Sequence, residues 1–145
     1  MSAVWYLMRG SGVVSLLLLT GALGLGILTR GGGRVPTLPR FATLALHRSL
    51  SLLAVTFIAI HVTAAVVDPY AGVALADLVL PFGAASQPLW VGLGALALDL
   101  VLALIVTGLL RRRIGQRAFR TVHWVAYAAW PLALLHAVGM GSDVT

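Results

Sequence analysis

The residues of this chain whose type and spacing could do chemistry are its four histidines, which form two widely spaced pairs. His47 and His61 are an i, i+14 pair in one apolar stretch, and His123 and His136 are an i, i+13 pair in another. In an α-helix, a step of about 14 residues rises roughly 21 Å, which is most of the thickness of a bilayer core. Each stretch therefore offers one imidazole near each face of a membrane.

Two such helices side by side would form two sites, each with two opposed imidazoles. This arrangement suits two stacked haems, each with its iron held axially by two histidines. A lone histidine in an apolar helix is more often a hydrogen-bonded core residue, but two pairs at nearly equal spacing favour iron ligation. The sequence therefore predicts two haem irons, with His47, His61, His123 and His136 as the ligands.

The second pair does not fit an ideal helix as simply as the first. An i, i+14 step returns to within about 40° of the starting direction, so His47 and His61 can face one side. An i, i+13 step leaves the rings of His123 and His136 roughly 140° apart. Either a tightened turn near Pro131 restores the register, or the two haems approach this span from different sides.

The composition places these histidines in a membrane. Of the 145 residues, 60% are hydrophobic and only 10% are charged, whereas soluble domains are about 25% charged. The absence of cysteine excludes disulfides, iron–sulfur clusters and Cys-ligated zinc. The net charge of +6 comes from arginines between apolar runs, so it does not indicate nucleic-acid binding.

We expect an all-α integral membrane protein, a four-helix transmembrane bundle that binds two b-type haems and forms one domain over residues 1–145. The predicted spans are about residues 11–28, 41–67, 89–110 and 121–138. The first span could be a signal peptide, but it is long and no clear cleavage site follows it. Its glycines Gly21, Gly24 and Gly26 would let a neighbouring helix or a haem approach closely.

The loops fix the expected orientation. Two of them are rich in arginine, TRGGGRVPTLPR and RRRIGQRAFR, and the positive-inside rule places both in the cytoplasm. The nearly uncharged loop 68–88, with an interfacial or re-entrant segment VALADLVLPF, and both termini then lie outside the plasma membrane. The second and fourth spans run parallel, so His47 and His123 share the inner half and His61 and His136 share the outer half.

Three stretches of the chain resemble the ferric reductase-like transmembrane domain, which ferric reductases, NADPH oxidases and the membrane subunit of the bacterial methionine sulfoxide reductase system share. They are WYLMRGSGVVSLLLLTGALGLGILTR, LHRSLSLLAVTFIAIHV and FRTVHWVAYAAWPLALLHAVGMGSD. The resemblance implies the same two ligand pairs. Many family members also carry cytoplasmic flavin and nicotinamide domains, for which this chain has no site, so we expect a separate donor or a fragment of a longer protein.

Iron with two axial imidazoles has no open position, which favours electron transfer without a catalytic residue in this chain. We expect an oxidoreductase or electron-transfer subunit that takes electrons from a cytoplasmic flavoprotein or a quinol. The outer acceptor would be ferric iron, oxygen or a reductase. One alternative is the haem b subunit of a quinol-oxidising respiratory complex. Another is a haem-free membrane assembly or transport protein.

Other polar residues are candidates for supporting roles. Arg48 on the inner side and Arg9 on the outer side could grip haem propionates, because arginine binds carboxylates with two parallel hydrogen bonds. Each ligand ring should also donate its second N–H to an acceptor that fixes its tautomer. The hydroxyls of Ser51, Thr56 and Thr63 are candidates, although bonding to their own helix is the favoured interpretation. Asp99, near the centre of the third span, is costly if charged.

Overall fold

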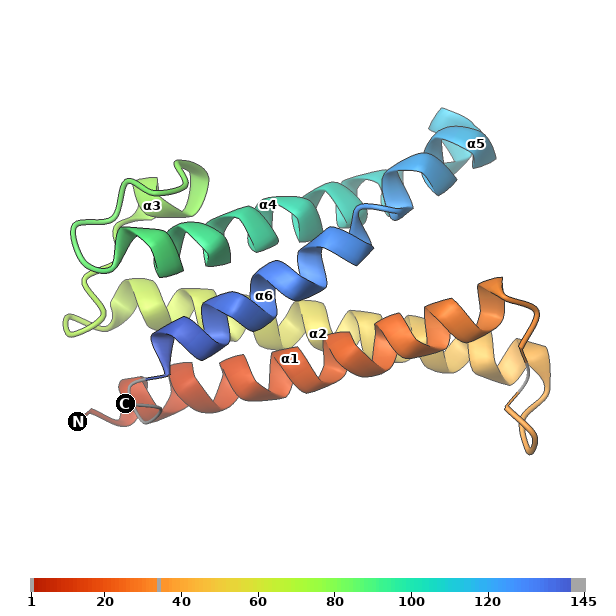
Figure 1. The fold of residues 1–145 in the computed structure, drawn as a ribbon, viewed down its shortest axis with the longest axis horizontal. Coiled ribbons are helices and arrows are strands. Elements are labelled where there is room, and N and C mark those ends of the chain that lie inside the picture. The colour runs from red at the N-terminus through yellow and green to blue at the C-terminus, as the bar shows by residue number, and fades with distance from the viewer. Residues whose placement is uncertain (1, 34, 142–145) are drawn as a thin grey trace. The chain divides into compact units, whose positions relative to one another are not determined.

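The computed structural model describes residues 2–33 and 35–141, and every regular element within these ranges is an α-helix (Figure 1). The helices are α1 (Ala3–Arg30), α2 (Arg40–Val67), α3 (Leu75–Val79), α4 (Pro88–Leu109), α5 (Arg111–His123) and α6 (Ala126–Met140). The chain divides into two compact units, Met1–Ala71 and Gly72–Thr145. The last four residues of the C-terminus, which is expected to lie outside the membrane, fall outside the described residues.

The first unit is an antiparallel pair of long helices, α1 and α2, joined by a Gly/Pro-rich loop (Figure 1). The hydroxyl of Ser2 accepts a hydrogen bond of 3.1 Å from the backbone N–H of Trp5, which caps the start of α1. Gly31 ends this helix. Asp68 ends α2, and Pro69 follows it without a backbone N–H to continue the helix.

The second unit is built around α4, which contacts α3, α5 and α6. This helix begins at Pro88, where the missing proline N–H is not needed and its fixed φ angle suits a first turn. A Cβ atom built on Gly139 would overlap the ring of Trp90. The glycine therefore lets α6 approach α4 closely.

The second and third predicted spans match α2 and α4 to within one residue at each end. The first helix starts earlier than predicted, at Ala3, because the Ser2 cap lies at the start of the chain. The loop between α2 and α4 holds only the five-residue helix α3.

The fourth predicted span, 121–138, is not one continuous helix. The Arg-rich segment expected to be a loop forms α5, which Gly115 interrupts with a φ of 82°. The chain then tightens, because the backbone N–H groups of Val125, Tyr127 and Ala128 bond to carbonyls three residues earlier. This is 3₁₀ geometry. The tightened turn therefore comes before Pro131, which lies inside α6.

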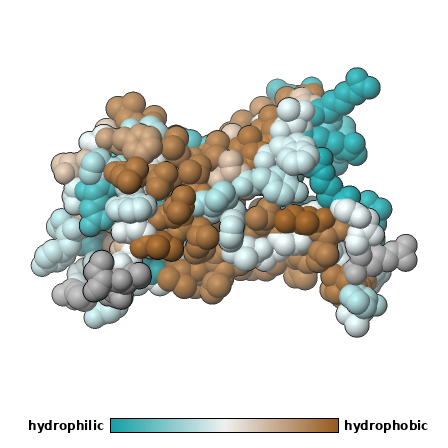
Figure 2. All heavy atoms as spheres, in the orientation of Figure 1, coloured by the Kyte–Doolittle hydropathy of each residue, from teal (hydrophilic) through white to brown (hydrophobic). Residues whose placement is uncertain are grey.

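Large apolar side chains face outward, while the buried ones are small. Leu17 is 67% exposed and Leu109 is 81% exposed, whereas Ala54 and Ala95 are buried. Small residues between helices and large apolar residues outside are typical of membrane proteins. Figure 2 shows hydrophobic residues over the helices and hydrophilic residues near their ends. Helices α1, α2 and α4 are long and apolar enough to cross a membrane, whereas α6 is shorter at 15 residues.

Candidate functional site

Two of the predicted ligands, His47 and His61, lie on α2 and form hydrogen bonds with backbone carbonyls of α1. The Nδ1 atom of His61 lies 2.7 Å from the carbonyl oxygen of Met8. The Nδ1 atom of His47 lies 2.8 Å from the carbonyl oxygen of Ala22. Both rings are half-buried. The helix pair therefore holds its two imidazoles at separate levels, and the i, i+14 interval of the rings on α2 equals that of their acceptors on α1.

The second unit repeats this arrangement at His136. Its Nδ1 atom, on α6, lies 2.7 Å from the carbonyl oxygen of Trp90 on α4. As in the first unit, the ring is half-buried and its partner is a main-chain atom of the neighbouring long helix.

These contacts fix the tautomer of each ring. A carbonyl oxygen can only accept a hydrogen bond, so Nδ1 must carry the proton and donate it. In a neutral imidazole the Nε2 atom then holds the lone pair, which is the form that binds a metal ion. A backbone carbonyl that orients the other nitrogen is a common partner of a metal-ligating histidine. Each of these three rings is therefore in the form that could bind haem iron.

A glycine makes room for each of these three rings. It stands one helical turn after the acceptor, at i+4, in every case: Gly12 after Met8, Gly26 after Ala22 and Gly94 after Trp90. We call each such carbonyl and glycine a histidine seat.

A Cβ atom built on any of the three glycines would press on the ring. It would lie 2.9 Å from Nδ1 of His61 at Gly12, 3.3 Å from Cε1 of His47 at Gly26 and 2.6 Å from Nδ1 of His136 at Gly94. Contacts shorter than 3.0 Å require an atom to shift. The glycines thus permit the ring to reach the carbonyl one helical turn away.

His123 is placed differently from the other three histidines. It is the last residue of α5, it is exposed, and its ring centroid lies 5.2 Å from that of Phe119. The structure therefore places three of the four predicted ligands on seats.

The hydroxyls considered as partners of the ligand rings bond to their own helix instead. Ser51 donates to the carbonyl of His47, Thr56 to that of Leu52 and Thr63 to that of Ala59, at 2.7, 2.9 and 2.7 Å. This confirms the favoured interpretation from the sequence. The main-chain acceptors were missed, although Gly12 and Gly26 on α1 are spaced i, i+14, as the histidines on α2 are.

The remaining candidates from the sequence, Arg9, Arg48 and Asp99, differ in their exposure and contacts. The Arg9 guanidinium stacks over the Trp5 ring at 4.9 Å. Arg48 is exposed on α2. Asp99 is half-buried in α4, and no hydrogen bond or ion pair joins its side chain to another described residue.

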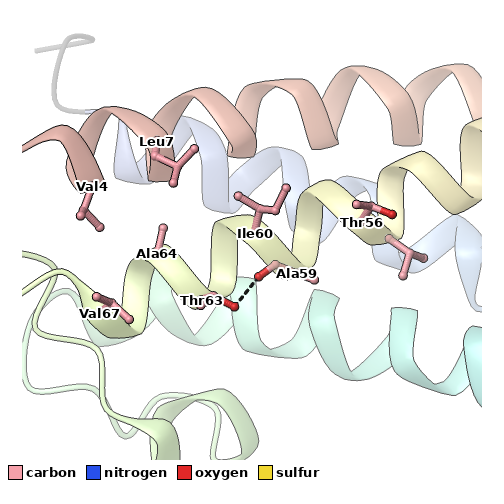
Figure 3. Close-up of a pocket in the computed structure, with 9 residues that line it drawn as sticks. Val4, Leu7, Thr56, Ala59, Ile60, Thr63, Ala64 and Val67 are labelled. Atoms are coloured by element: carbon pink, nitrogen blue, oxygen red, sulfur yellow. Dashed lines mark hydrogen bonds between the residues drawn. The ribbon is translucent and has the colours of Figure 1, made fainter.

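An apolar groove of about 670 Å³ runs along α1 and α2, and the residues that line it are not those of the histidine seats (Figure 3). Val4 and Leu7 line it from α1, and α2 residues between 55 and 67 line the rest. The hydroxyl of Thr63 donates its hydrogen to the carbonyl of Ala59 in its own helix, so that hydrogen does not point into the groove (Figure 3). The groove is thus lined by apolar groups and by hydroxyls that bond within α2.

Among the described residues, no group of three or more His, Asp or Glu side chains could hold a bare metal ion. Axial ligation of haem needs only two histidines per iron. The family model described as "Ferric reductase like transmembrane component" matches residues 11–134. No curated protein and no solved structure matches the chain.

Proposed function

Because the chain belongs to the ferric reductase-like transmembrane component family, we propose that it is a di-haem b-type cytochrome that carries electrons across the plasma membrane. Family membership indicates a transmembrane electron-transfer function, and the number of haems is our proposal. The observation that supports it most is the hydrogen bond from Nδ1 of His47, His61 and His136 to a backbone carbonyl. Three rings on two different helices are thereby held in the tautomer that ligates iron.

The proposed pairs follow from the order of the helices. If both Arg-rich segments are cytoplasmic, α2 and α6 run in the same direction. His47 and His123 then belong to the inner site, and His61 and His136 to the outer site. The i, i+14 step along α2 separates the two levels by roughly 21 Å of helix rise. Haem held by these residues would supply one-electron exchange.

Two arginines are suited to hold the anionic edges of the haems. Arg9 directly follows Met8, whose carbonyl seats His61, so it lies at the level of the outer site. Arg48 directly follows His47 and lies at the level of the inner site. A guanidinium can bind a propionate with two parallel hydrogen bonds. We propose these two residues as propionate partners.

The electron donor is proposed to be a cytoplasmic flavoprotein or a quinol, because no flavin or nicotinamide motif occurs in this sequence. The outer acceptor is proposed to be ferric iron, oxygen or a partner reductase. With two imidazole ligands on each iron, the acceptor would take its electron without binding to the iron.

A reduced-minus-oxidised optical spectrum of the purified protein, with haem measured per polypeptide, tests this proposal. We expect b-type bands and two haems per chain. The double variant His47→Ala, His61→Ala removes one ligand from each site and is the matched control, which should lose both haems. A chain purified without b-type bands would instead support a haem-free assembly or transport protein. Reduction by a quinol without any flavoprotein would identify a quinol as the electron donor.

A further inference from the structure

We infer that the carbonyl of Leu104 and the glycine Gly108 on α4 form a fourth histidine seat, which receives His123 when haem is bound. This inference rests on the proposed di-haem function and names the residues that would position its fourth ligand.

The three observed seats follow one rule of spacing. The ring donates from Nδ1 to the carbonyl of one residue, and a glycine at i+4 from that residue leaves room for it. On α1 the two seats are related by an i, i+14 step, from Met8 to Ala22 and from Gly12 to Gly26. A second seat on α4 at the same interval would begin at i+14 from Trp90.

That interval leads to a carbonyl and a glycine. Leu104 stands at i+14 from Trp90, and Gly108 stands at i+14 from Gly94. Both are inside α4, which ends at Leu109. The long helices α1 and α4, which provide the seats, therefore carry glycines at the same interval. Each of them packs against a helix whose histidine occupies a seat.

The surroundings of the Leu104 carbonyl match those of an occupied seat. At the seat of His61, the hydroxyl of Ser11 also donates to the Met8 carbonyl, at 3.1 Å. On α4, the hydroxyl of Thr107 donates to the Leu104 carbonyl at 3.2 Å. In both cases a hydroxyl residue three positions after the acceptor comes just before the glycine.

The space beside Gly108 is open, in contrast to the occupied seats. A Cβ atom built on Gly108 meets nothing within 4 Å. His123 belongs to the same unit, at the end of α5 and just before the tightened turn that leads into α6. Seating it would require a shift of α5 relative to α4.

The tightened turn also explains why the second pair of histidines is one residue closer in sequence than the first. Compared with an α-helix, a 3₁₀ turn rotates the chain about 20° more per residue around the helix axis. It also rises about 0.5 Å more per residue along that axis. Three to five such residues between Val122 and Ala128 therefore add about 60–100° of rotation and about 1.5–2.5 Å of rise. The stretch from His123 to His136 then roughly matches the rise and the direction of the i, i+14 step on α2.

The test uses the full chain with its haems and compares Gly108→Ala and Gly108→Leu with Gly10→Ala. The control is a glycine of α1 that also has no atom within 4 Å of a built Cβ but belongs to no seat. Haem per polypeptide and the electron paramagnetic resonance signals of the two low-spin ferric haems are measured. His123→Ala identifies the signal of the haem that this residue ligates.

We expect Gly108→Leu to deplete the haem that His123→Ala depletes, with retention about 10-fold weaker or worse, as for loss of other groups that orient a metal ligand. Gly108→Ala should shift the g values of that signal alone, and Gly10→Ala should leave both signals unchanged. Wild-type levels of both haems with unshifted signals in both Gly108 variants would overturn the inference. If the wild-type chain binds no haem, the proposed function fails first.

Discussion

The Nδ1 atom of His61 lies 2.7 Å from the carbonyl oxygen of Met8, although the two residues are far apart in the sequence. Within an α-helix that carbonyl already accepts the N–H of Gly12, so the imidazole adds a further donor to an oxygen with two lone pairs. The contact joins α1 to α2 through the main chain. It also leaves Nε2, the nitrogen proposed to bind iron, on the far side of the ring from that carbonyl.

The glycines of the occupied seats should be intolerant of even a methyl group. Gly12→Ala and Gly94→Ala would place a Cβ atom within 3.0 Å of a ring nitrogen, and overpacking of this kind costs about 1–3 kcal/mol. We expect both variants to lower the melting temperature and to deplete the outer haem. Thermal unfolding in detergent and haem per polypeptide measure the two effects.

Gly10→Ala is the matched control for this prediction, because Gly10 lies inside α1 and nothing lies within 4 Å of its built Cβ atom. Alanine is favoured over glycine inside a helix by about 1 kcal/mol, so the control should be neutral or stabilising. If all three variants behave alike, helix propensity and not the histidine contact governs these positions.

The ends of α2 and α4 could be predicted from the sequence because local signals mark them. Asp68-Pro69 stops one helix, Pro88 starts the other, and apolar runs of membrane length fill both. The four histidines were recognisable as candidate ligands for a similar reason, since the spacing within each pair is visible in the sequence without any packing. Local chemistry was therefore enough for these elements.

The seats could not be predicted in the same way. Which carbonyl faces a histidine depends on the register of two antiparallel helices, which no local residue pattern specifies. The break between α5 and α6 was also missed, because Trp124 and Val125 are apolar and continue the helical pattern. Three short-range N–H bonds, at Val125, Tyr127 and Ala128, make the turn, and they depend on main-chain geometry alone.

Asp99 should tolerate loss of its charge. It is half-buried in α4, and a charged carboxylate at this depth of a bilayer is costly. Asp99→Asn keeps the shape and removes the charge, so we expect both haems to remain and stability to change by no more than about 0.5 kcal/mol. Haem content and thermal unfolding measure this. Loss of either haem would show that the carboxylate positions a ligand or a helix.

The orientation of the chain can be read with single cysteines, because the sequence contains none. Gly31→Cys suits the loop after α1, since Gly31 has an ordinary φ of −72°, whereas Gly32 has a φ of 71° that would strain a cysteine. Gly83→Cys reports on the loop before α4. We expect a membrane-impermeant maleimide to label position 83, and not position 31, in intact cells.

Both cysteines should react after the cells are permeabilised, which controls for burial. The reverse pattern in intact cells would exchange the inner and outer sites and contradict the positive-inside assignment. The assignment of Arg48 to the inner site and Arg9 to the outer site would be exchanged with it.

The pairing of the ligands makes the sharpest prediction, because it specifies which double variants are worse than single ones. His61→Ala and His136→Ala should each deplete the outer haem, since one imidazole alone holds iron weakly. The double variant of these two should then lose no more than either single variant. His61→Ala combined with His123→Ala should lose both haems, because it damages both sites.

Haem per polypeptide and the two low-spin resonance signals distinguish these outcomes, and the amount of folded protein in the membrane is the control. Residues that act on one site are not additive, whereas residues at separate sites are. If the double variant of His61 and His136 lost both haems while each single variant lost one, the two residues would belong to different sites. His61 would then pair with His123, and α2 and α6 could not run in the same direction.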